Sequence, residues 1–445
     1  MKRILVIGAG RSASSLIKYL LENAPQFDWW VTVGDMDLTL AQSKVMGFER
    51  GRAVMFNGLD ENARLPYLQE ADLVISMLPA SFHAPIVKAC IQMKKSVITP
   101  SYLSDEIKAM HLEAVQQGVL VLNELGVDPG IDHMSAMEII DRLKESGAEI
   151  TGFESFTGGL VAPESDNNPW NYKFTWNPRN VVLAGQGGAV KFIQEGTYKY
   201  IPYHKVFRRT EIITIPEYGR FEGYANRDSL KYRSIYGLEA IRTLYRGTLR
   251  RVGFCKAWDL FVQLGVTDDS YVMENTETMT HRQFFNSFLA YSPKDSVETK
   301  LKYYLNIHQD DGDLMEKLEY LGVFDNTPIG IKNATPAQIL QRILEKKWSL
   351  EPNDKDMTVM FHKFNYQLGG DQRELHAHMV VMGEDQTYTS MAKTVGLPLG
   401  IAAKHMLQGT FSATGVQLPI QKEIYQPILS ELAHHGISFQ ERLFT

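Results

Sequence analysis

The feature that most constrains the fold is a glycine-rich turn that directly follows a short apolar run near the start of the chain. The run Ile4-Leu5-Val6-Ile7 is continuously apolar, as in a strand buried on both faces. The turn that follows reads Gly8-Ala9-Gly10-Arg11-Ser12-Ala13. Its first glycine permits a tight turn, its second lets the backbone approach a pyrophosphate, and its final alanine permits close helix packing. The pattern predicts a βαβ dinucleotide-binding unit with the phosphates at a helix N-terminus, and a ligand-free tight βα turn is the alternative.

An acidic residue after the second apolar run bears on the identity of the dinucleotide. Asp35 ends that run, and Asp37 adds a second negative charge. A carboxylate here would accept hydrogen bonds from a ribose 2'-hydroxyl and repel a 2'-phosphate, so we expect NAD, with NADP less favoured. A turn or helix-capping role is the alternative for Asp35.

Short apolar runs alternate with helical patterns over residues 1 to about 125. We expect strands at Ile4-Ile7, Val31-Val33, Ala53-Phe56, Leu73-Met77, Ser96-Thr99 and Val119-Leu122. Continuous apolar character is typical of a parallel sheet covered by helices. This part is therefore predicted to be an α/β Rossmann domain with a doubly wound parallel sheet.

The rhythm of the sequence changes after Asp128-Pro129-Gly130. Residues 128–237 combine a helix near 132–146 with aromatic, proline and strand-like segments, and strand patterns return at 351–385. Residues 238–350 are mainly helical and charged. We expect residues 1–127 to form a Rossmann domain, a second α/β domain to begin at 128, and residues 238–350 to form a small helical domain; the later elements are candidates to return to the earlier domains.

Charge and cysteine content exclude some classes of function. A formal charge of -6 provides no basic field for nucleic acid, and no apolar stretch approaches the roughly 18 residues of a membrane span. Only Cys90 and Cys255 occur, which favours a reducing cytoplasm over a disulfide-stabilised setting. We expect a cytoplasmic enzyme acting on a small molecule, and a homodimer.

Two loops follow buried strands at the edge where parallel sheets bind ligands. Leu78 and Pro79 lead to His83, where a nicotinamide cofactor would pass, and Tyr102 follows the next strand. His83 is an acid-base candidate with helix capping as the alternative. Tyr102 could hydrogen-bond a substrate or simply pack.

The most distinctive stretch is the junction Asn123 to His133, with two glycines, a proline and three acids. Asp132 can cap the helix that follows. Glu124 and Asp128 lack so simple a role, and a carboxylate here could bind a substrate ammonium or transfer a proton.

Several longer motifs resemble saccharopine dehydrogenase of the glutamate-forming type over essentially the whole chain. They are the junction itself, Ser101-Tyr102, Gly158 to Glu164, Asn168 to Trp176, Asn226-Arg227-Asp228-Ser229, Arg246-Gly247-Thr248-Leu249-Arg250, and Tyr388 to Gly396. The resemblance implies oxidation of saccharopine with a nicotinamide cofactor and hydrolysis of the imine to glutamate and 2-aminoadipate 6-semialdehyde, or the reverse. It also implies that the end of the chain returns to the first domain. The implied domains are a Rossmann domain of residues 1–127 plus about 386–445, a mixed-sheet α/β substrate domain of 128–237 plus about 351–385, and a small helical domain of 238–350.

The resemblance also implies a set of site residues. The substrate-binding positions are Tyr102, Asp128, Trp176, Arg227, Arg246 and Arg250. Guanidinium groups suit the three carboxylates of saccharopine because two parallel donors match two oxygens. Asp128 and Tyr102 are the preferred candidates for proton transfer, and His133 is a less favoured one. Fungal NADP-using members carry a basic residue where this chain has Asp35.

Alternatives remain open at several positions. Arg242, Arg246 and Arg250 are spaced by four, as on a solvated helix face, and Trp176 could be a core aromatic. His376 and His378 lack a third ligand, so we expect no metal. The rival functions are a reductive aminase for carboxylated polyamines, such as carboxynorspermidine, and a non-catalytic NAD-binding sensor.

Overall fold

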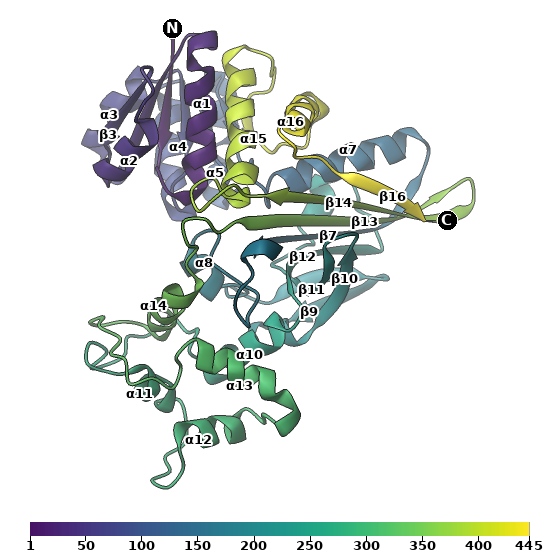
Figure 1. The fold of residues 1–445 in the computed structure, drawn as a ribbon. Coiled ribbons are helices and arrows are strands. Elements are labelled where there is room, and N and C mark those ends of the chain that lie inside the picture. Colours follow the sequence, from purple (N-terminus) through teal and green to yellow (C-terminus); the bar gives the residue numbers. More distant parts are fainter. Residues whose placement is uncertain (445) are drawn as a thin grey trace. The chain divides into compact units, whose positions relative to one another are not determined.

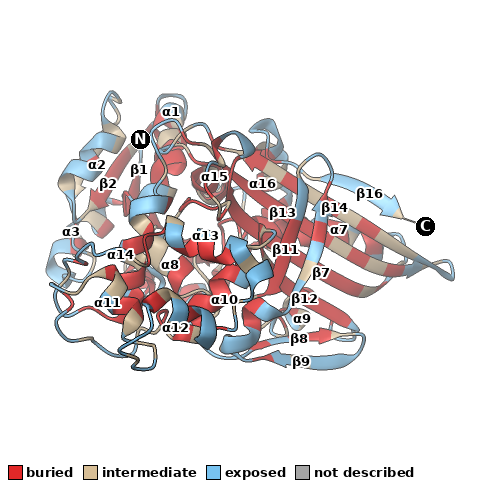
Figure 2. Cartoon of the chain, turned by 60° about the horizontal axis from the view of Figure 1, so that its bottom comes forward, coloured by how far each residue is buried: buried red, intermediate tan, exposed pale blue. Residues whose placement is uncertain are grey.

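The six predicted apolar runs all form strands of one parallel sheet in the computed structural model, which describes residues 1–444. A seventh strand joins them from the far end of the chain, in the order β15-β6-β5-β4-β1-β2-β3. The strands are β1 (Lys2–Ile7), β2 (Trp29–Asp35), β3 (Gly51–Met55), β4 (Leu73–Ser76), β5 (Ser96–Ile98), β6 (Leu120–Leu122) and β15 (Gly415–Gln417). The sheet confirms the doubly wound α/β prediction, and most of β1 and of β2 is buried (Figure 2).

The chain divides into two compact units, of which the first contains this sheet. The first unit comprises Met1–Ile150, the short segment Ile235–Gly237, and the chain from Asn365 onward. The second comprises Thr151–Ser234 and Leu238–Phe364. The finer division into three domains stays a prediction.

The end of the chain completes the first unit by packing on its beginning (Figure 1). The helices of the first unit are α1 (Ser14–Phe27), α2 (Leu38–Val45), α3 (Glu61–Glu70), α4 (His83–Gln92), α5 (Asp105–Ala109), α6 (His111–Gln117), α7 (Ile131–Glu145), α15 (Ser390–Leu407) and α16 (Lys422–His434). A side chain at Gly396 would come within 2.7 Å of the Leu16 backbone nitrogen. Glycine is therefore required for α15 to lie this close to α1. Strands β14 (Asp371–Met382) and β16 (Gln440–Phe444) pair antiparallel in the same unit.

The second unit contains a mixed sheet, as expected. Its strands are β7 (Glu149–Val161), β8 (Val190–Gln194), β9 (Thr197–Ile201), β10 (Thr210–Ile215), β11 (Gly219–Ala225), β12 (Thr243–Arg251) and β13 (Asp356–Leu368). The order is β10-β11-β12-β7-β13, and β8 pairs with both β12 and β9. Strands β12 and β7 are parallel, whereas β10, β11 and β12 are antiparallel neighbours.

Short helices follow the sheet strands of the second unit. They are α8 (Pro178–Val182), α9 (Tyr232–Ile235), α10 (Phe254–Leu264), α11 (His281–Asn286), α12 (Val297–Tyr304), α13 (Gly312–Tyr320) and α14 (Pro336–Trp348). Large aromatic rings form the core between α10, α14 and the loop before α8, with Trp170 stacked on Phe261 at 5.7 Å between ring centroids and edge-on to Trp348 at 5.2 Å. This core supports the buried end of β12.

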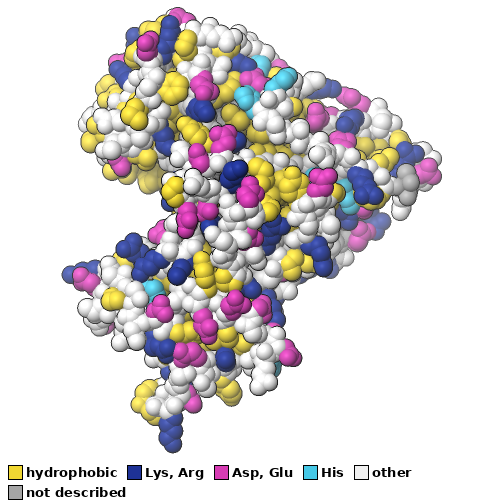
Figure 3. All heavy atoms as spheres, in the orientation of Figure 1, with side chains coloured by type: hydrophobic (Ala, Val, Ile, Leu, Met, Phe, Trp, Pro, Cys, Tyr) yellow, Lys and Arg dark blue, Asp and Glu magenta, His cyan; other side chains and the backbone are white. Residues whose placement is uncertain are grey.

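Two further features of the molecule are its surface charge and the apolarity of its helices. On the face shown in Figure 3, basic side chains are interspersed with acidic ones and form no continuous basic field. Within residues 1–444, no helix combines the length and apolarity that a membrane crossing needs.

Candidate functional site

The glycine loop is built at the end of β1 as the sequence predicts. Gly8 has φ +104°, and a side chain there would come within 3.2 Å of the Met77 carbonyl oxygen. Arg11, Ser12 and Ala13 form a 3₁₀ turn that leads into α1. A side chain at Gly10 would meet no atom within 4 Å. The open space beside Gly10 fits a dinucleotide whose pyrophosphate lies against the backbone.

Asp35 supports this loop from the end of β2. Its Oδ2 accepts a 2.7 Å hydrogen bond from the Ala9 backbone N–H, and its Oδ1 accepts one of 2.9 Å from Asp37 N–H. Both carboxylate oxygens therefore hold the backbone. The Asp37 side chain caps α2 by accepting from the Leu40 N–H at 3.1 Å.

The loop after β4 places its three predicted residues in different environments. Leu78 is half-buried and Pro79 is exposed, whereas His83 is only 1% exposed. The His83 Nδ1 lies 2.9 Å from Ser76 Oγ, and its Nε2 lies 2.7 Å from Ser101 Oγ. Burial lowers the pKa of His83 to about 4, so the imidazole is neutral at neutral pH.

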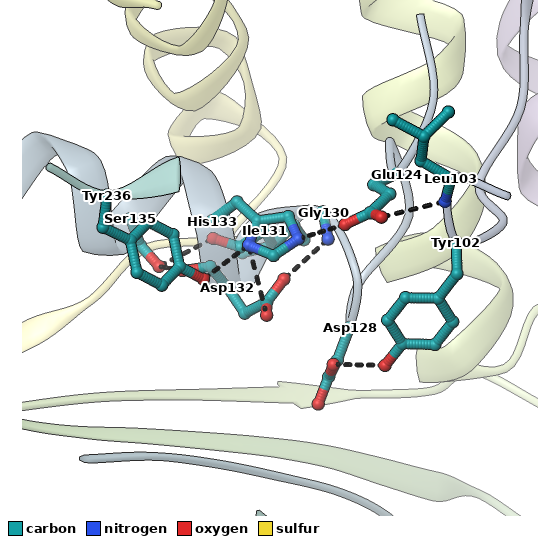
Figure 4. A network of polar contacts seen from close by, with 10 residues as sticks. All are labelled: Tyr102, Leu103, Glu124, Asp128, Gly130, Ile131, Asp132, His133, Ser135 and Tyr236. Atoms are coloured by element: carbon teal, nitrogen blue, oxygen red, sulfur yellow. Dashed lines mark hydrogen bonds and ion pairs between the residues drawn. The ribbon is translucent and has the colours of Figure 1, made fainter. Parts of the chain in front are cut away.

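The junction between β6 and α7 carries a buried polar network (Figure 4). His133 lies between Glu124 and Tyr236, with Nε2 at 2.7 Å from Glu124 Oε2 and Nδ1 at 2.6 Å from Tyr236 Oη. Glu124 is 2% exposed and His133 is fully buried. Asp132 accepts a 2.6 Å hydrogen bond from the Gly130 N–H within the same turn. Residues from two separate segments of the first unit, Met1–Ile150 and Ile235–Gly237, thus meet here.

Tyr102 and Asp128 lie beside this network and contact each other. The Tyr102 hydroxyl donates to Asp128 Oδ1 at 3.3 Å, and the Asp128-Pro129 peptide bond is cis. Figure 4 shows the pair offset from the row formed by Glu124, His133 and Tyr236. Tyr102 and Asp128, which the sequence analysis gave as candidates for proton transfer, are therefore in contact in the first unit.

The second unit brings two of the predicted arginine motifs together. Asn226 N–H donates to the Arg246 carbonyl at 2.9 Å, and Arg246 N–H donates to Ser229 Oγ at 3.0 Å. Arg246 is buried on β12 with its guanidinium 4.3 Å from the Tyr232 ring centroid, whereas Arg227 is exposed in the loop. The alternative of a solvated helix face is wrong for Arg246, because β12 is a buried strand.

Arg250 lies at the buried end of β12 among aromatic rings. It is 4% exposed, and its guanidinium carbon lies 5.2, 5.4 and 5.9 Å from the rings of Tyr172, Phe254 and Tyr224. One terminal nitrogen donates to the Leu249 carbonyl at 2.9 Å, and Nε has no hydrogen-bond partner among the described residues. A buried guanidinium among aromatic rings, with an unbonded Nε, is a favourable place for an anion.

Trp176 differs from the aromatic core that precedes it. Trp170 is buried, but Trp176 is half-buried at the start of the turn into α8. Its position is not that of a core tryptophan. Tyr172 and Tyr224 lie next to Arg250 but were not found from the sequence. They come from a loop and from β11, and only the packed chain brings these segments to β12.

Metal-ligating side chains do not cluster in the part of the chain that the structure describes. No group of three or more His, Cys, Asp or Glu residues there could hold a metal ion. On β14, His376 Nε2 lies 2.7 Å from Glu374 Oε1.

Comparison with protein families gives two adjoining matches. The model of the saccharopine dehydrogenase NADP binding domain matches residues 4–122, and that of the saccharopine dehydrogenase C-terminal domain matches residues 126–437. Together they cover most of the chain.

Similar proteins extend over the whole chain. The saccharopine dehydrogenase [NADP(+), L-glutamate-forming] of Schizosaccharomyces pombe is 31% identical over 100% of this chain and 99% of its own length, and that of Saccharomyces cerevisiae is 32% identical over 99% of each. The mitochondrial alpha-aminoadipic semialdehyde synthase of Bos taurus is 33% identical over 98% of this chain, which spans only 47% of that protein. The solved apo structure of the yeast L-Glu-forming enzyme matches all of both chains with a TM-score of 0.88 and 31% identity.

These findings correct the cofactor prediction. The matching domain is described as NADP binding, and the fungal relatives are named for NADP(+). The preference for NAD inferred from Asp35 was wrong. The structure supplies a reason, since the Asp35 carboxylate binds the N–H groups of Ala9 and Asp37 with both oxygens.

Proposed function

The chain belongs to the saccharopine dehydrogenase family, and on this premise we propose that it is an NADP-dependent, L-glutamate-forming saccharopine dehydrogenase of lysine metabolism. Its reaction converts saccharopine, NADP⁺ and water to glutamate, 2-aminoadipate 6-semialdehyde, NADPH and a proton, or the reverse. The two fungal relatives, which this chain matches over nearly their full length, support this function. The chain spans about half of the mammalian relatives it matches, so their further activities are not assigned to it.

The observation that carries the proposal is the buried charge of Arg250, for which residues 1–444 provide no ion-pair partner. Its pKa is lowered by burial and raised by Tyr224, Tyr172 and Cys255, with a net increase. These three groups are neutral at pH 7 and do not neutralise the guanidinium. Burying a cation without a counter-ion is costly, and a carboxylate ligand would offset that cost. Saccharopine offers three carboxylates, and Arg227, Arg246 and Trp176 are further members of the proposed binding set.

The Tyr102–Asp128 pair is proposed to handle the amine. The secondary ammonium must lose its proton before oxidation, and water must then be activated to attack the imine. Asp128 can accept a hydrogen bond from the nitrogen, while the Tyr102 hydroxyl fixes the orientation of that carboxylate at 3.3 Å.

The cofactor is proposed to bind at the glycine loop through Gly8, Gly10, Arg11, Ser12 and Ala13, with Leu78 and Pro79 farther along the strand ends. NADP, when bound, supplies the acceptor for the hydride that leaves the carbon next to the secondary amine. The support is the open space at Gly10, which a side chain would fill.

Turnover of saccharopine tests the proposal directly. Purified protein is mixed with saccharopine and either NADP⁺ or NAD⁺, and reduced cofactor and glutamate are both measured. We expect both products with NADP⁺, and much less with NAD⁺. Binding of NADP⁺ without any turnover would instead favour a non-catalytic sensor, and turnover only with carboxynorspermidine would favour the polyamine enzyme.

Assembly and location are proposed from general features of the chain. We propose a homodimer, the commonest assembly of soluble enzymes, and a cytoplasmic setting, which is supported by two buried free cysteines, Cys90 and Cys255. Light scattering of the eluting protein would give the mass of the assembly.

A further inference from the structure

The backbone on either side of Tyr102 is held by two buried side chains from different segments. We propose that His83 and Glu124 are positioning residues that clamp the segment Ser101-Tyr102-Leu103 and thereby set the Tyr102 hydroxyl against Asp128. This inference rests on the proposed function for its catalytic consequence. The clamp itself can be tested without turnover.

His83 holds the residue before Tyr102. It begins α4, and its ring bridges the end of β4 and the loop after β5. Its Nδ1 lies 2.9 Å from Oγ of Ser76, the last residue of β4, and its Nε2 lies 2.7 Å from Oγ of Ser101, which follows β5. Thr99 Oγ1 lies 3.2 Å from the same Nε2 and accepts from the Ser101 N–H at 3.3 Å. A buried ring with both nitrogens engaged fixes the side chain of Ser101.

Glu124 holds the residue after Tyr102. Its Oε1 accepts a 2.9 Å hydrogen bond from the Leu103 N–H, and its own backbone N–H donates to the Ser101 carbonyl at 3.1 Å. Glu124 has φ +56°, in the left-handed region that disfavours non-glycine residues. The surrounding contacts therefore determine this conformation.

Glu124 is in turn fixed by the network behind it. Its second carboxylate oxygen lies 2.7 Å from His133 Nε2, and the opposite nitrogen of that ring lies 2.6 Å from the Tyr236 hydroxyl (Figure 4). Such fully engaged buried networks restrict the rotamers of their members. His133 and Tyr236 thus direct Glu124 toward Leu103.

The clamp accounts for how Tyr102 can act from an irregular loop. A tyrosine has only two side-chain torsions, so fixing the backbone on both sides leaves little freedom for its hydroxyl. Small misplacements of a reacting group cost up to about 10²-fold in rate, which makes such support functionally important.

Two substitutions of His83 distinguish its contact with Ser76 from its contact with Ser101. In His83→Gln the amide reaches the position of Nε2 and keeps the contact with Ser101, whereas in His83→Asn it reaches only the position of Nδ1 and keeps Ser76. We expect His83→Gln to stay within about threefold of wild-type kcat/KM and His83→Asn to lose about tenfold or more, with unchanged NADPH affinity. Equal activities of both variants and the wild type would overturn the proposal.

A double-mutant cycle distinguishes positioning from general damage. If His83 acts through Tyr102, His83→Asn costs little further activity in the Tyr102→Phe background, because the group being positioned is already gone. A loss by the same factor in both backgrounds would contradict the clamp. Ser96→Ala is the matched control: it removes a hydrogen bond to Leu120 N–H at the other end of β5 and should leave activity unchanged.

Hydrogen exchange tests the clamp independently of catalysis. We expect the amides of Ser101 to Leu103 to exchange faster in His83→Asn than in wild type, and to be unchanged in His83→Gln. Unchanged exchange in His83→Asn would refute the clamp even if the enzyme is active. Lack of saccharopine turnover by the wild type would refute the proposed function alone.

Discussion

The hydroxyl of Tyr102 lies 3.3 Å from Oδ1 of Asp128, although the two residues follow different strands of the parallel sheet. The loop after β5 carries the first and the junction after β6 carries the second. Because parallel strands end at the same edge of the sheet, these two loops are neighbours. The pair is the centre of the proposed proton chemistry in the first unit.

Removing one member of this pair should affect turnover more than folding. Tyr102→Phe deletes only the hydroxyl, and we expect about a tenfold loss of kcat/KM for saccharopine, the size of a hydrogen bond to a charged group. NADPH affinity and the unfolding midpoint should change little. Steady-state kinetics measure kcat/KM, fluorescence titration measures NADPH affinity, and denaturant unfolding gives the midpoint. Tyr67→Phe is the control. The pair has no role in turnover if Tyr102→Phe keeps wild-type kinetics.

Replacing Arg250 should weaken substrate binding without destabilising the fold. Arg250→Met removes a buried charge that no carboxylate neutralises, so we expect the free energy of unfolding to stay within about 1 kcal/mol of wild type or to rise. The KM for saccharopine should increase at least about tenfold through loss of a charge-assisted contact.

The neighbouring Arg251 provides the control. It donates to the Tyr218 carbonyl at 3.0 Å and lies over Phe221, so Arg251→Met should leave KM unchanged. An Arg250→Met variant that unfolds readily yet binds saccharopine normally would show that Arg250 is structural.

Substitution of the two glycines of the glycine loop should have different effects, one on NADPH binding and the other on stability. Gly10→Ala should fold normally, because φ is -63° and a side chain meets nothing within 4 Å, yet it should weaken NADPH binding by filling the space beside the backbone. Gly8→Ala should cost about 1–3 kcal/mol of stability, because φ is +104°. Thermal unfolding with and without NADPH separates the two effects. Normal NADPH affinity in Gly10→Ala would place the pyrophosphate elsewhere.

Buried His83 should make stability depend on pH. Its pKa is about 4 in the folded protein against an ordinary value of 6.5, so the unfolded chain binds the proton more readily between these pH values. Stability should therefore fall as the pH decreases from about 6.5 to 4, by on the order of 3 kcal/mol from this group alone. Denaturant unfolding at a series of pH values should show a shallower decline for His83→Gln. Parallel curves for the two proteins would contradict the assignment.

Local sequence predicted the elements of the first unit well. The apolar runs around Ile4 and Val74 became buried strands, and the turn at Gly8 adopted positive φ. These features depend on side chains and backbone preferences within a few residues. The long return of the chain, with α15 packed on α1, followed only from the family resemblance.

Cofactor choice shows where local reasoning failed. Asp35 has the right position in the sequence for a ribose contact, but its orientation depends on the N–H groups of Ala9 and Asp37. The spacing of Arg242, Arg246 and Arg250 was equally ambiguous. Strand pairing with β7 and β11 placed Arg246 and Arg250 on a buried strand.

The sequence alone therefore determined the dinucleotide-binding architecture, the loops that would carry chemistry and, through its motifs, the family. Only the tertiary structure decided that His83 binds Ser101, that Glu124, His133 and Tyr236 form one network, and that Arg250 is buried among aromatic rings. The physical reason is that periodicity and turn preferences act between near neighbours. Hydrogen bonds between His133 and Tyr236, which are 103 residues apart, arise only when the whole chain packs.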